Sequence, residues 1–247
     1  MRPAVELSGV SKIFRLCHGR NRSLKSLVLS FRRQKYENLV ALDDVSLSVE
    51  PGETLAVIGK NGSGKSTLLR LLGNVFKPTH GKVVVRGQVS ALLELGAGLH
   101  PELTGMENIF LNGTILGLRT REIRRRLGDI LEFSELGKFI DAPLKSYSNG
   151  MVMRLGFSVA VQVDPDVLLV DEVMAVGDEA FQEKCYHKIA EFQKAGKTII
   201  FVSHDLQAVR KVASRAVWLS AGRVQADGAV DRAIDAYLAS IPHGSQG

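Results

Sequence analysis

The chain has 247 residues, of which 45% are hydrophobic, and a formal net charge of +6. This length is sufficient for one sizeable hydrophobic core with a subdomain, and the composition is ordinary for a globular protein. No apolar run approaches the roughly 18 residues of a membrane-spanning helix, and the N-terminus lacks the apolar stretch of a signal peptide, so we expect the chain to stay in the cytoplasm.

The first predicted elements are two strands on either side of a basic segment. Residues 5–10 predict a short strand, and residues 40–49 predict a second one. Between Lys12 and Tyr36 lie eight Lys and Arg residues and no acid, which is more positive charge than the whole chain carries net. Such a block favours an anionic partner: a membrane surface, a nucleic acid or a phosphate-bearing substrate. A solvated basic loop is the alternative.

Part of this basic segment has the periodicity of an amphipathic helix. Four of its apolar residues lie at i, i+3, i+4 and i+7, on one helix face: Leu24, Leu27, Val28 and Phe31. We expect residues 15–39 to form an insert whose short basic helix suits the membrane interface. An ordinary helix packed on the core is the alternative.

A glycine-rich turn follows the next predicted strand. Residues 53–58 predict a buried strand and residues 66–72 predict a helix. The turn between them matches the P-loop pattern and consists of Gly59, Lys60, Asn61, Gly62, Ser63, Gly64, Lys65, Ser66 and Thr67. We expect backbone N–H groups and the helix dipole to hold phosphates, Lys65 to reach the β- and γ-phosphates of a nucleotide, and the Ser66 hydroxyl to bind Mg²⁺. The P-loop alone does not identify the class of NTPase, because a kinase, a GTPase or a helicase can carry it. Strand, loop and helix together indicate an α/β fold.

Residues 90–160 predict a mostly helical subdomain, with helices near residues 107–118 and 121–133. Close to its end, the turn Tyr147-Ser148-Asn149-Gly150-Met151 precedes another helical pattern. A polar, glycine-containing turn at a helix start is a potential anion site, although such a turn is also common without any ligand.

The next predicted strand, residues 167–171, is apolar and ends in two carboxylates. We expect Asp171 to hold Mg²⁺ and Glu172 to orient or deprotonate the attacking water. Strand ends with acids are common, so this motif gains weight from its place after the P-loop.

The remaining elements complete a parallel sheet. Residues 179–195 predict a helix and residues 198–203 a buried strand, which with the strand before them make a βαβ unit with a right-handed crossover. His204 follows this strand. Residues 216–226 predict a hairpin, and residues 241–247 predict a flexible tail.

The motifs, in this order, resemble those of the ABC transporter ATPases. The turn at residues 147–151 is similar to the family's signature motif, usually Leu-Ser-Gly-Gly-Gln: Ser148 and Gly150 match it, and the other three residues depart from it. The resemblance covers nearly the whole chain. It implies a single ABC-type ATPase domain over residues 1–240, with a P-loop NTPase core, a helical subdomain and an N-terminal antiparallel β part.

The same resemblance implies further site residues. His204 matches the switch histidine that contacts the γ-phosphate, and Asp178 matches the D-loop aspartate across the dimer. Phe14 stands where the family places an aromatic that stacks on adenine, and core packing is its alternative. The family's Q-loop glutamine is not evident. Glu94 is the nearest polar candidate for that role and for Mg²⁺, with simple solvation as the alternative.

The family's mechanism implies a homodimer that closes head-to-tail around two ATP molecules. Ser148 and Gly150 of one copy would face the γ-phosphate held by the other copy. The resemblance also implies a separate transmembrane permease subunit, since the sequence has no membrane span. We therefore expect a peripheral protein at the cytoplasmic face of the inner membrane, with ATP and Mg²⁺ as cofactors.

Three segments are similar to ATPases that export O-antigen, capsule and teichoic acid: residues 96–109, 147–151 and 171–178. The resemblance implies a lipid-linked polysaccharide as substrate, carried on polyprenyl pyrophosphate. Some of these exporters carry a C-terminal glycan-binding domain, which we do not expect in this chain.

Three other functions are compatible with parts of the sequence. They are the ATPase of another ABC importer or exporter, a non-transport ABC ATPase that acts on nucleic acid or ribosomes, and a binding module that has lost hydrolysis. Non-transport members usually fuse two cassettes or carry a long coiled coil, so we expect no nucleic-acid partner. The residues kept for hydrolysis argue against the third: Lys65, Asp171, Glu172 and His204.

Overall fold

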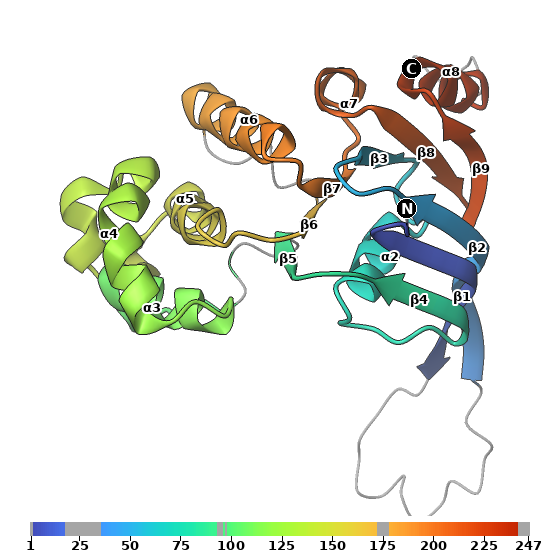
Figure 1. The fold of residues 1–247 in the computed structure, drawn as a ribbon. Coiled ribbons are helices and arrows are strands. Elements are labelled where there is room, and N and C mark those ends of the chain that lie inside the picture. The colour runs from blue at the N-terminus through green and yellow to red at the C-terminus, as the bar shows by residue number, and fades with distance from the viewer. Residues whose placement is uncertain (1, 18–35, 93–95, 97, 172–177, 242–247) are drawn as a thin grey trace, which may run out of the picture.

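The computed structural model describes residues 2–17, 36–92, 96, 98–171 and 178–241. In Figure 1 these residues form a strand-rich part, which contains both sheets, and a helical part that projects from one side of it. The chain enters the helical part after its fifth strand and returns to the sheet with its sixth. The helical part is therefore an insertion in an α/β core.

The core contains a six-stranded sheet. Its strands, in their order across the sheet, are β5 (Val89–Leu92), β6 (Val167–Asp171), β7 (Thr198–Val202), β3 (Thr54–Ile58), β8 (Arg215–Ser220) and β9 (Arg223–Gly228). All neighbours are parallel except β8 and β9, which form the antiparallel hairpin expected near the end of the chain. The central strands β3 and β7 are buried along their whole length, which explains their continuous apolar sequences.

Alternating residues of the central strands face two separate hydrophobic cores. Leu55 and Val57 of β3 contact α2 (Lys65–Leu72) and the N-terminal sheet, whereas Ala56 and Ile58 face the other side. On that other side lie α5 (Asn149–Ala160), α6 (Glu179–Lys194), α7 (Leu206–Val212) and α8 (Val230–Ala239). The sheet is thus covered on both faces, as expected for parallel strands.

The N-terminal sheet is antiparallel and contains β2 (Tyr36–Val49), β1 (Val5–Cys17) and β4 (His80–Val85), in this order. Both β1 and β2 are longer than the sequence predicted, because their pairing continues from Ile13 opposite Val40 to Cys17 opposite Tyr36. The expected insert at residues 15–39 therefore begins and ends with strand residues. Its amphipathic segment, residues 24–31, lies outside the described residues.

The helical part contains α3 (Gly105–Ile115), α4 (Thr120–Ser134) and α5, with two short 3₁₀ helices, η1 (Gly137–Asp141) and η2 (Leu144–Ser146), between α4 and α5. It has a hydrophobic core of its own, centred on Ile109, Ile123 and Ile130. Helix α3 begins with a capping box, in which the Thr104 hydroxyl accepts from the Glu107 N–H and the Glu107 carboxylate accepts from the Thr104 N–H. The expected subdomain at residues 90–160 also includes β5, which belongs to the six-stranded sheet.

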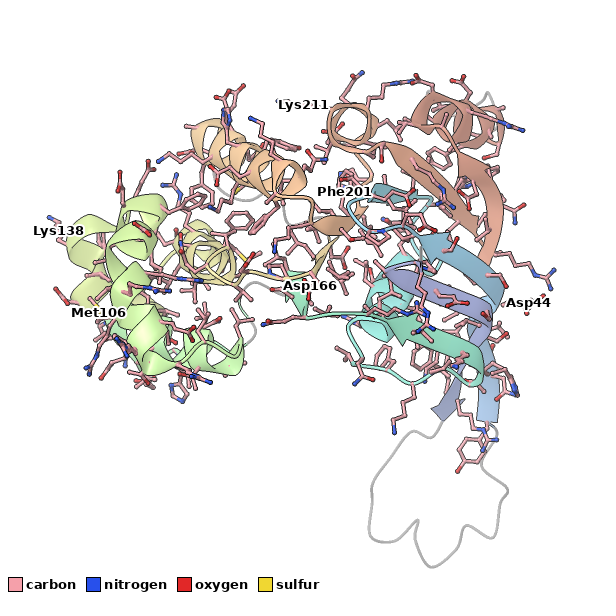
Figure 2. All side chains as sticks on the ribbon, in the orientation of Figure 1. Asp44, Met106, Lys138, Asp166, Phe201 and Lys211 are labelled. Carbon is pink, nitrogen blue, oxygen red and sulfur yellow. The ribbon has the colours of Figure 1, made fainter. Side chains whose placement is uncertain are left out.

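Apolar side chains lie mainly in the interior of the molecule and charged side chains lie mainly on its surface. Figure 2 shows Phe201 inside the core, where it is 2% exposed, and Lys138 and Lys211 directed outward. Among the described residues, no helix has the length and apolar character needed to span a membrane. The sequence interpretation gave no prediction for β4, α7 or α8.

Candidate functional site

Three of the predicted motifs lie at one edge of the parallel sheet. Val202, at the end of β7, pairs with Asp171 of β6 on one side and with Val57 of β3 on the other. The P-loop leaves β3 one residue after Ile58, and His204 follows β7 by two residues. The carboxyl edge of a parallel sheet is where α/β proteins bind ligands. The strand register therefore brings the P-loop, Asp171 and His204 together.

The P-loop backbone is fixed by contacts that exclude side chains. A Cβ atom on Gly59 would lie 2.2 Å from the Leu219 carbonyl oxygen, and one on Gly64 would lie 2.5 Å from the Ala41 carbonyl oxygen. Both glycines also have positive φ, 148° and 108°. Only glycine satisfies both demands. The loop thus packs closely against β8 and β2.

The first turn of α2 offers backbone N–H donors and positive charge. Its N-cap is Gly64, so no side chain caps the helix, and no acid lies in its first turn. Lys65 is 6% exposed, and its Nζ donates to the Gly59 and Lys60 carbonyl oxygens at 2.8 and 3.1 Å. A helix N-terminus next to a buried ammonium group is suited to bind phosphate. The geometry agrees with the ATP-binding role predicted for this loop.

The two described candidates for Mg²⁺ have suitable chemistry and position. Ser66 is exposed in the first turn of α2, and Asp171 is half-buried at the end of β6, two strands away. Mg²⁺ prefers oxygen ligands and is usually held by one or two protein groups together with phosphates and water. Hydroxyl and carboxylate oxygens beside a phosphate-binding loop fit that requirement. Glu94, the third candidate for Mg²⁺, and Glu172, predicted to orient or deprotonate the attacking water, lie outside the described residues.

Ser63, in the middle of the P-loop, carries a polar atom without a protein partner. Its side chain is buried, and its Oγ has no hydrogen-bond partner among the described residues. A buried hydroxyl without a partner is unusual and costs free energy. Ligand phosphate oxygens are acceptors that would satisfy it.

The signature turn, residues 147–151, lies at the start of α5 in the helical part. Ser148 is the N-cap of α5, and its hydroxyl accepts from the Met151 N–H at 3.3 Å. Tyr147 and Met151, two of the residues that depart from the family motif, pack on the core of the helical part. The Tyr147 hydroxyl also donates to the Phe139 carbonyl oxygen at 2.6 Å. Tyr147 and Met151 thus attach the turn to the helical part, while Ser148 stays exposed.

Asp178 makes two interactions within its own chain. One carboxylate oxygen accepts from the Phe181 N–H at 3.0 Å and caps α6, and the other pairs with Arg154 at 2.7 Å. The backbone hydrogen bond from Phe181, with the Arg154 charge, holds the pKa of Asp178 below its ordinary value. The carboxylate is therefore ionised at neutral pH and connects α6 with α5.

Phe14 lies in β1 at the partly exposed end of the N-terminal sheet. Its ring meets the Phe76 ring edge-on at 5.4 Å, and the Lys12 ammonium lies 5.1 Å from its centre. One side of the ring is thus occupied by protein, as in the packing alternative. The same contacts fix the ring orientation, which an adenine-stacking role would require.

The sequence interpretation missed Arg154 and Glu135. Arg154 contacts both Asp178 and Glu135, and its side chain is only 18% exposed. It is the single charged residue of α5, in an otherwise apolar helix. That isolation was the available signal, because a charge in a buried helix requires partners.

Comparisons with known proteins agree with this geometry. A family model described as ABC transporter matches residues 42–175, more than half of the chain. An O-antigen export system ATP-binding protein RfbB of Klebsiella pneumoniae is 48% identical over 241 residues, which cover 96% of this chain and 98% of that protein. A teichoic acids export ATP-binding protein TagH of Shouchella clausii is 40% identical over 237 residues, 96% of this chain and 66% of that protein.

The fold has solved counterparts as well. A dimeric ATP-binding cassette in a post-hydrolysis state, bound to ADP and Pi, superposes with a TM-score of 0.74 at 25% identity, over 92% of this chain and 98% of that one. This match confirms the predicted ATPase core with its helical subdomain and N-terminal antiparallel sheet. Together with the family match, it shows that the chain belongs to the ABC transporter family, as one of its ATP-hydrolysing members.

Proposed function

We propose that this chain is the ATP-hydrolysing subunit that powers export of a polyprenyl-pyrophosphate-linked polysaccharide, of the O-antigen type, across the bacterial inner membrane. The observation that carries the proposal is the 48% identity to an O-antigen export ATP-binding protein over nearly the full length of both chains. Relatives named for teichoic acid export, at 40% identity, support the same substrate class.

In this proposal each motif at the sheet edge has one task. Lys65 and the amides of Gly59–Thr67 bind the β- and γ-phosphates of ATP. Ser66 and Asp171 hold Mg²⁺, with Glu94 as a further candidate; the ion, when bound, neutralises charge on the phosphoryl group. Glu172 orients and deprotonates the attacking water, and His204 contacts the γ-phosphate. Phe14 stacks on adenine.

The second half of each site comes from another copy of the chain. We infer that Ser148 and Gly150, at the exposed start of α5, contact the γ-phosphate bound by the partner copy. Two observations support this: the turn presents an exposed hydroxyl at a helix N-terminus, and the similar cassette with bound ADP and Pi is a dimer. Closing the dimer would exclude water and complete the set of donors around the phosphoryl group.

The work of hydrolysis would be delivered to a separate permease subunit. We infer that the chain is bound peripherally at the cytoplasmic face of the inner membrane, where ATP is available. The basic residues between Lys12 and Tyr36 would lie close to the anionic lipid and to the pyrophosphate of the substrate. No nucleic-acid partner is part of this function.

The test separates hydrolysis from ATP-driven dimerisation. Wild type and Glu172→Gln are purified, assayed for ATP hydrolysis, and sized by gel filtration with and without ATP. We expect the variant to lose hydrolysis and to accumulate as an ATP-dependent dimer. Glu183→Gln, an exposed acid on α6, is the matched control and should behave as wild type.

Transport itself is tested in vesicles that contain this chain together with the transmembrane permease subunit of the exporter. ATP inside the wild-type vesicles should move a fluorescent polyprenyl-pyrophosphate glycan across the bilayer, and the Glu172→Gln complex should not. Full hydrolysis by Glu172→Gln without dimerisation would refute the catalytic assignment. Hydrolysis without glycan movement would refute the assigned substrate.

A further inference from the structure

Arg154 connects the signature helix to the start of α6. The residue lies six positions after Ser148, which is about 9 Å along α5. Its Nη2 pairs with the Asp178 carboxylate at 2.7 Å and its Nη1 with the Glu135 carboxylate at 3.1 Å. The guanidinium also lies 4.9 Å from the centre of the Phe181 ring. A planar guanidinium can hold two carboxylates at once, which a lysine ammonium does less well.

The two carboxylates belong to the ends of two other helices. Glu135 is the C-cap of α4, in the left-handed conformation with φ of 55°, and also pairs with Lys184 of α6. Asp178 is the N-cap of α6 and directly follows residues 172–177, the segment between the end of β6 and α6. Arg154 therefore holds α5 against both the outer helix α4 and the helix that follows the proposed catalytic segment.

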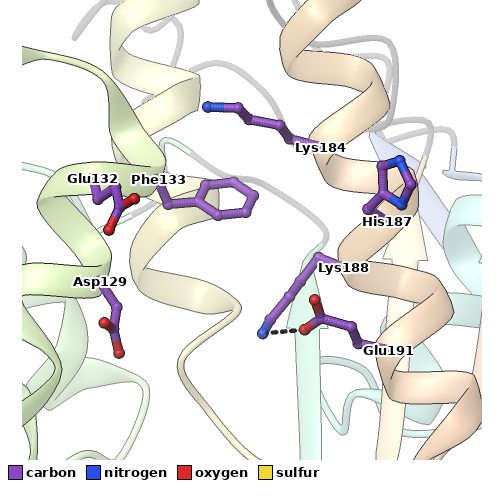
Figure 3. A pocket seen from close by; sticks show the side chains of 7 residues that line it. All are labelled: Asp129, Glu132, Phe133, Lys184, His187, Lys188 and Glu191. Carbon is purple, nitrogen blue, oxygen red and sulfur yellow. Dashed lines mark hydrogen bonds and ion pairs between the residues drawn. The ribbon is translucent and has the colours of Figure 1, made fainter.

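Beside this network, α4 and α6 are separated by a groove of about 360 Å³. Figure 3 shows Asp129 and Glu132 on the α4 wall facing Lys184 and Lys188 on the α6 wall, with Phe133 between them. The two helices thus approach each other here through long side chains. The contacts around Arg154 are well placed to fix how the helical part sits on the core.

The energetics favour a role in position over a role in stability. The Asp178 and Glu135 side chains are 66% and 44% exposed, so the ion pairs are partly screened by water and contribute little to the free energy of folding. Arg154 itself is only 18% exposed, so its orientation is determined by these two acids. An interaction that adds little stability but fixes a helix matters mainly where geometry limits a rate.

We propose that Arg154 is a positioning residue for ATP hydrolysis. It fixes the signature turn of one protomer relative to Asp178 at the start of α6 in the same protomer, so that a change in either is transmitted to the other. This proposal rests on the proposed function, in which Ser148 acts on the nucleotide of the partner copy and Glu172 acts on water. Loss of Arg154 would leave α5 and α6 folded but poorly aligned in the closed dimer.

The test compares Arg154→Gln, Arg154→Lys and Asp178→Asn in the full-length chain, with Arg210→Gln as control. The control removes a partly exposed Arg–Asp pair of comparable length, 3.0 Å, which connects α7 with α8 and does not involve α5 or α6. Asparagine is as good an N-cap as aspartate, so Asp178→Asn keeps the cap and removes the ion pair. Thermal midpoint, ATP affinity of the protomer, kcat, and ATP-dependent dimerisation in the Glu172→Gln background are measured for each.

We expect Arg154→Gln and Asp178→Asn each to lower kcat by about ten- to a hundredfold, with ATP affinity within about twofold of wild type. Arg154→Lys should recover part of the rate, and Arg210→Gln should match wild type. The double variant should be no slower than the slower single variant, because both remove one interaction. If Arg154→Gln does not fold, Asp178→Asn alone must show the loss of kcat.

Two results would overturn the proposal while the proposed function stands. One is a wild-type kcat in both single variants, with or without a change in thermal midpoint. The other is additive losses in the double variant, since Arg154 and Asp178 would then act separately. By contrast, absence of ATP hydrolysis and of Glu172→Gln dimers in the parent chain would refute the proposed function itself.

Discussion

The P-loop and the signature turn are both polar, glycine-containing turns at a helix start, but they are held in different ways. The P-loop is enclosed by backbone: carbonyl oxygens of Leu219 and Ala41 lie where Cβ atoms would be. The signature turn is held by side chains, through the Ser148 cap, the Tyr147 hydroxyl and the Arg154 ion pairs. A Cβ on Gly150 would meet only the Ser148 Oγ, at 3.8 Å.

This difference matches what each turn must do in the proposed mechanism. The P-loop binds phosphate within one protomer and benefits from a fixed shape, since preorganised donors cost nothing to arrange at the moment of reaction. The signature turn has to meet the nucleotide of a second copy after a domain movement. Side-chain attachments to α4, α6 and η1 let the turn follow the helical part as that part moves.

The largest expected effect comes from adding one methyl group to the P-loop. The same change in the signature turn serves as the comparison. Gly59→Ala should destabilise the fold by about 1–3 kcal/mol and abolish ATP binding, because the new Cβ would lie 2.2 Å from a backbone oxygen. Gly150→Ala should keep the fold and ATP binding, with a stability gain of up to about 1 kcal/mol from the better helix former. Its defect should be in hydrolysis, since a Cβ would obstruct the partner's phosphate.

Urea unfolding and fluorescent-nucleotide titration distinguish the two variants. Equal loss of ATP binding in both would show that the turns are constrained alike, against the comparison drawn here. Wild-type hydrolysis by Gly150→Ala would instead remove this glycine from the proposed trans contact.

Much of the fold was accessible from the sequence because the apolar runs were short, buried and bounded by turns. The strand at residues 167–171 and the helix at residues 179–195 were placed within one residue of the observed ends. The ribbon formed by β1 and β2 was not, because its outer residues such as Tyr36, Leu39 and Val40 are exposed and lack a period-two pattern. Pairing between two distant strands decides their length, and local patterning does not show it.

The candidate site likewise contains residues that the sequence predicts and contacts that it does not. Lys65 and Asp171 could be predicted because each belongs to a motif next to a buried strand, and the observed register brings those strand ends together. The pairing of Arg154 with Glu135 could not, because the two residues lie 19 positions apart and meet only when α4 and α5 pack. Contacts of this kind depend on tertiary structure, which a single sequence specifies only indirectly.

A smaller effect is expected from removing the hydroxyl of Tyr147, the first residue of the signature turn. Tyr147→Phe loses the hydrogen bond to the Phe139 carbonyl and should cost about 1 kcal/mol, or about 2–4 °C in thermal midpoint. Burial, together with the Asp141 charge, raises the pKa of the Tyr147 hydroxyl, so it remains a donor throughout the neutral range. ATP affinity should be unchanged, since the P-loop does not depend on this contact.

Tyr237→Phe is the matched control, because the Tyr237 hydroxyl has no hydrogen-bond partner within the described part of the chain and its ring contact with Trp218 is kept. A thermal midpoint of Tyr147→Phe equal to that of the control would mean that the hydroxyl does not hold the turn. A large loss of ATP affinity would mean that the two turns are coupled inside one protomer.

The smallest expected effect is a pH dependence of stability that arises from Asp178, the partner of Arg154. The pKa of Asp178 is lowered, first by the Phe181 backbone hydrogen bond, so its contribution to stability is complete above its ordinary pKa of 3.8 and is lost as pH falls through the lower folded value. Asp178→Asn retains the cap and lacks this titration. The unfolding midpoints of wild type and Asp178→Asn in urea are measured from pH 7 to pH 3. They should differ by a constant amount down to about pH 4 and converge below it. A difference that stays constant to pH 3 would show that Asp178 titrates alike in the folded and unfolded chain, and that its bonds to Phe181 and Arg154 do not stabilise the carboxylate.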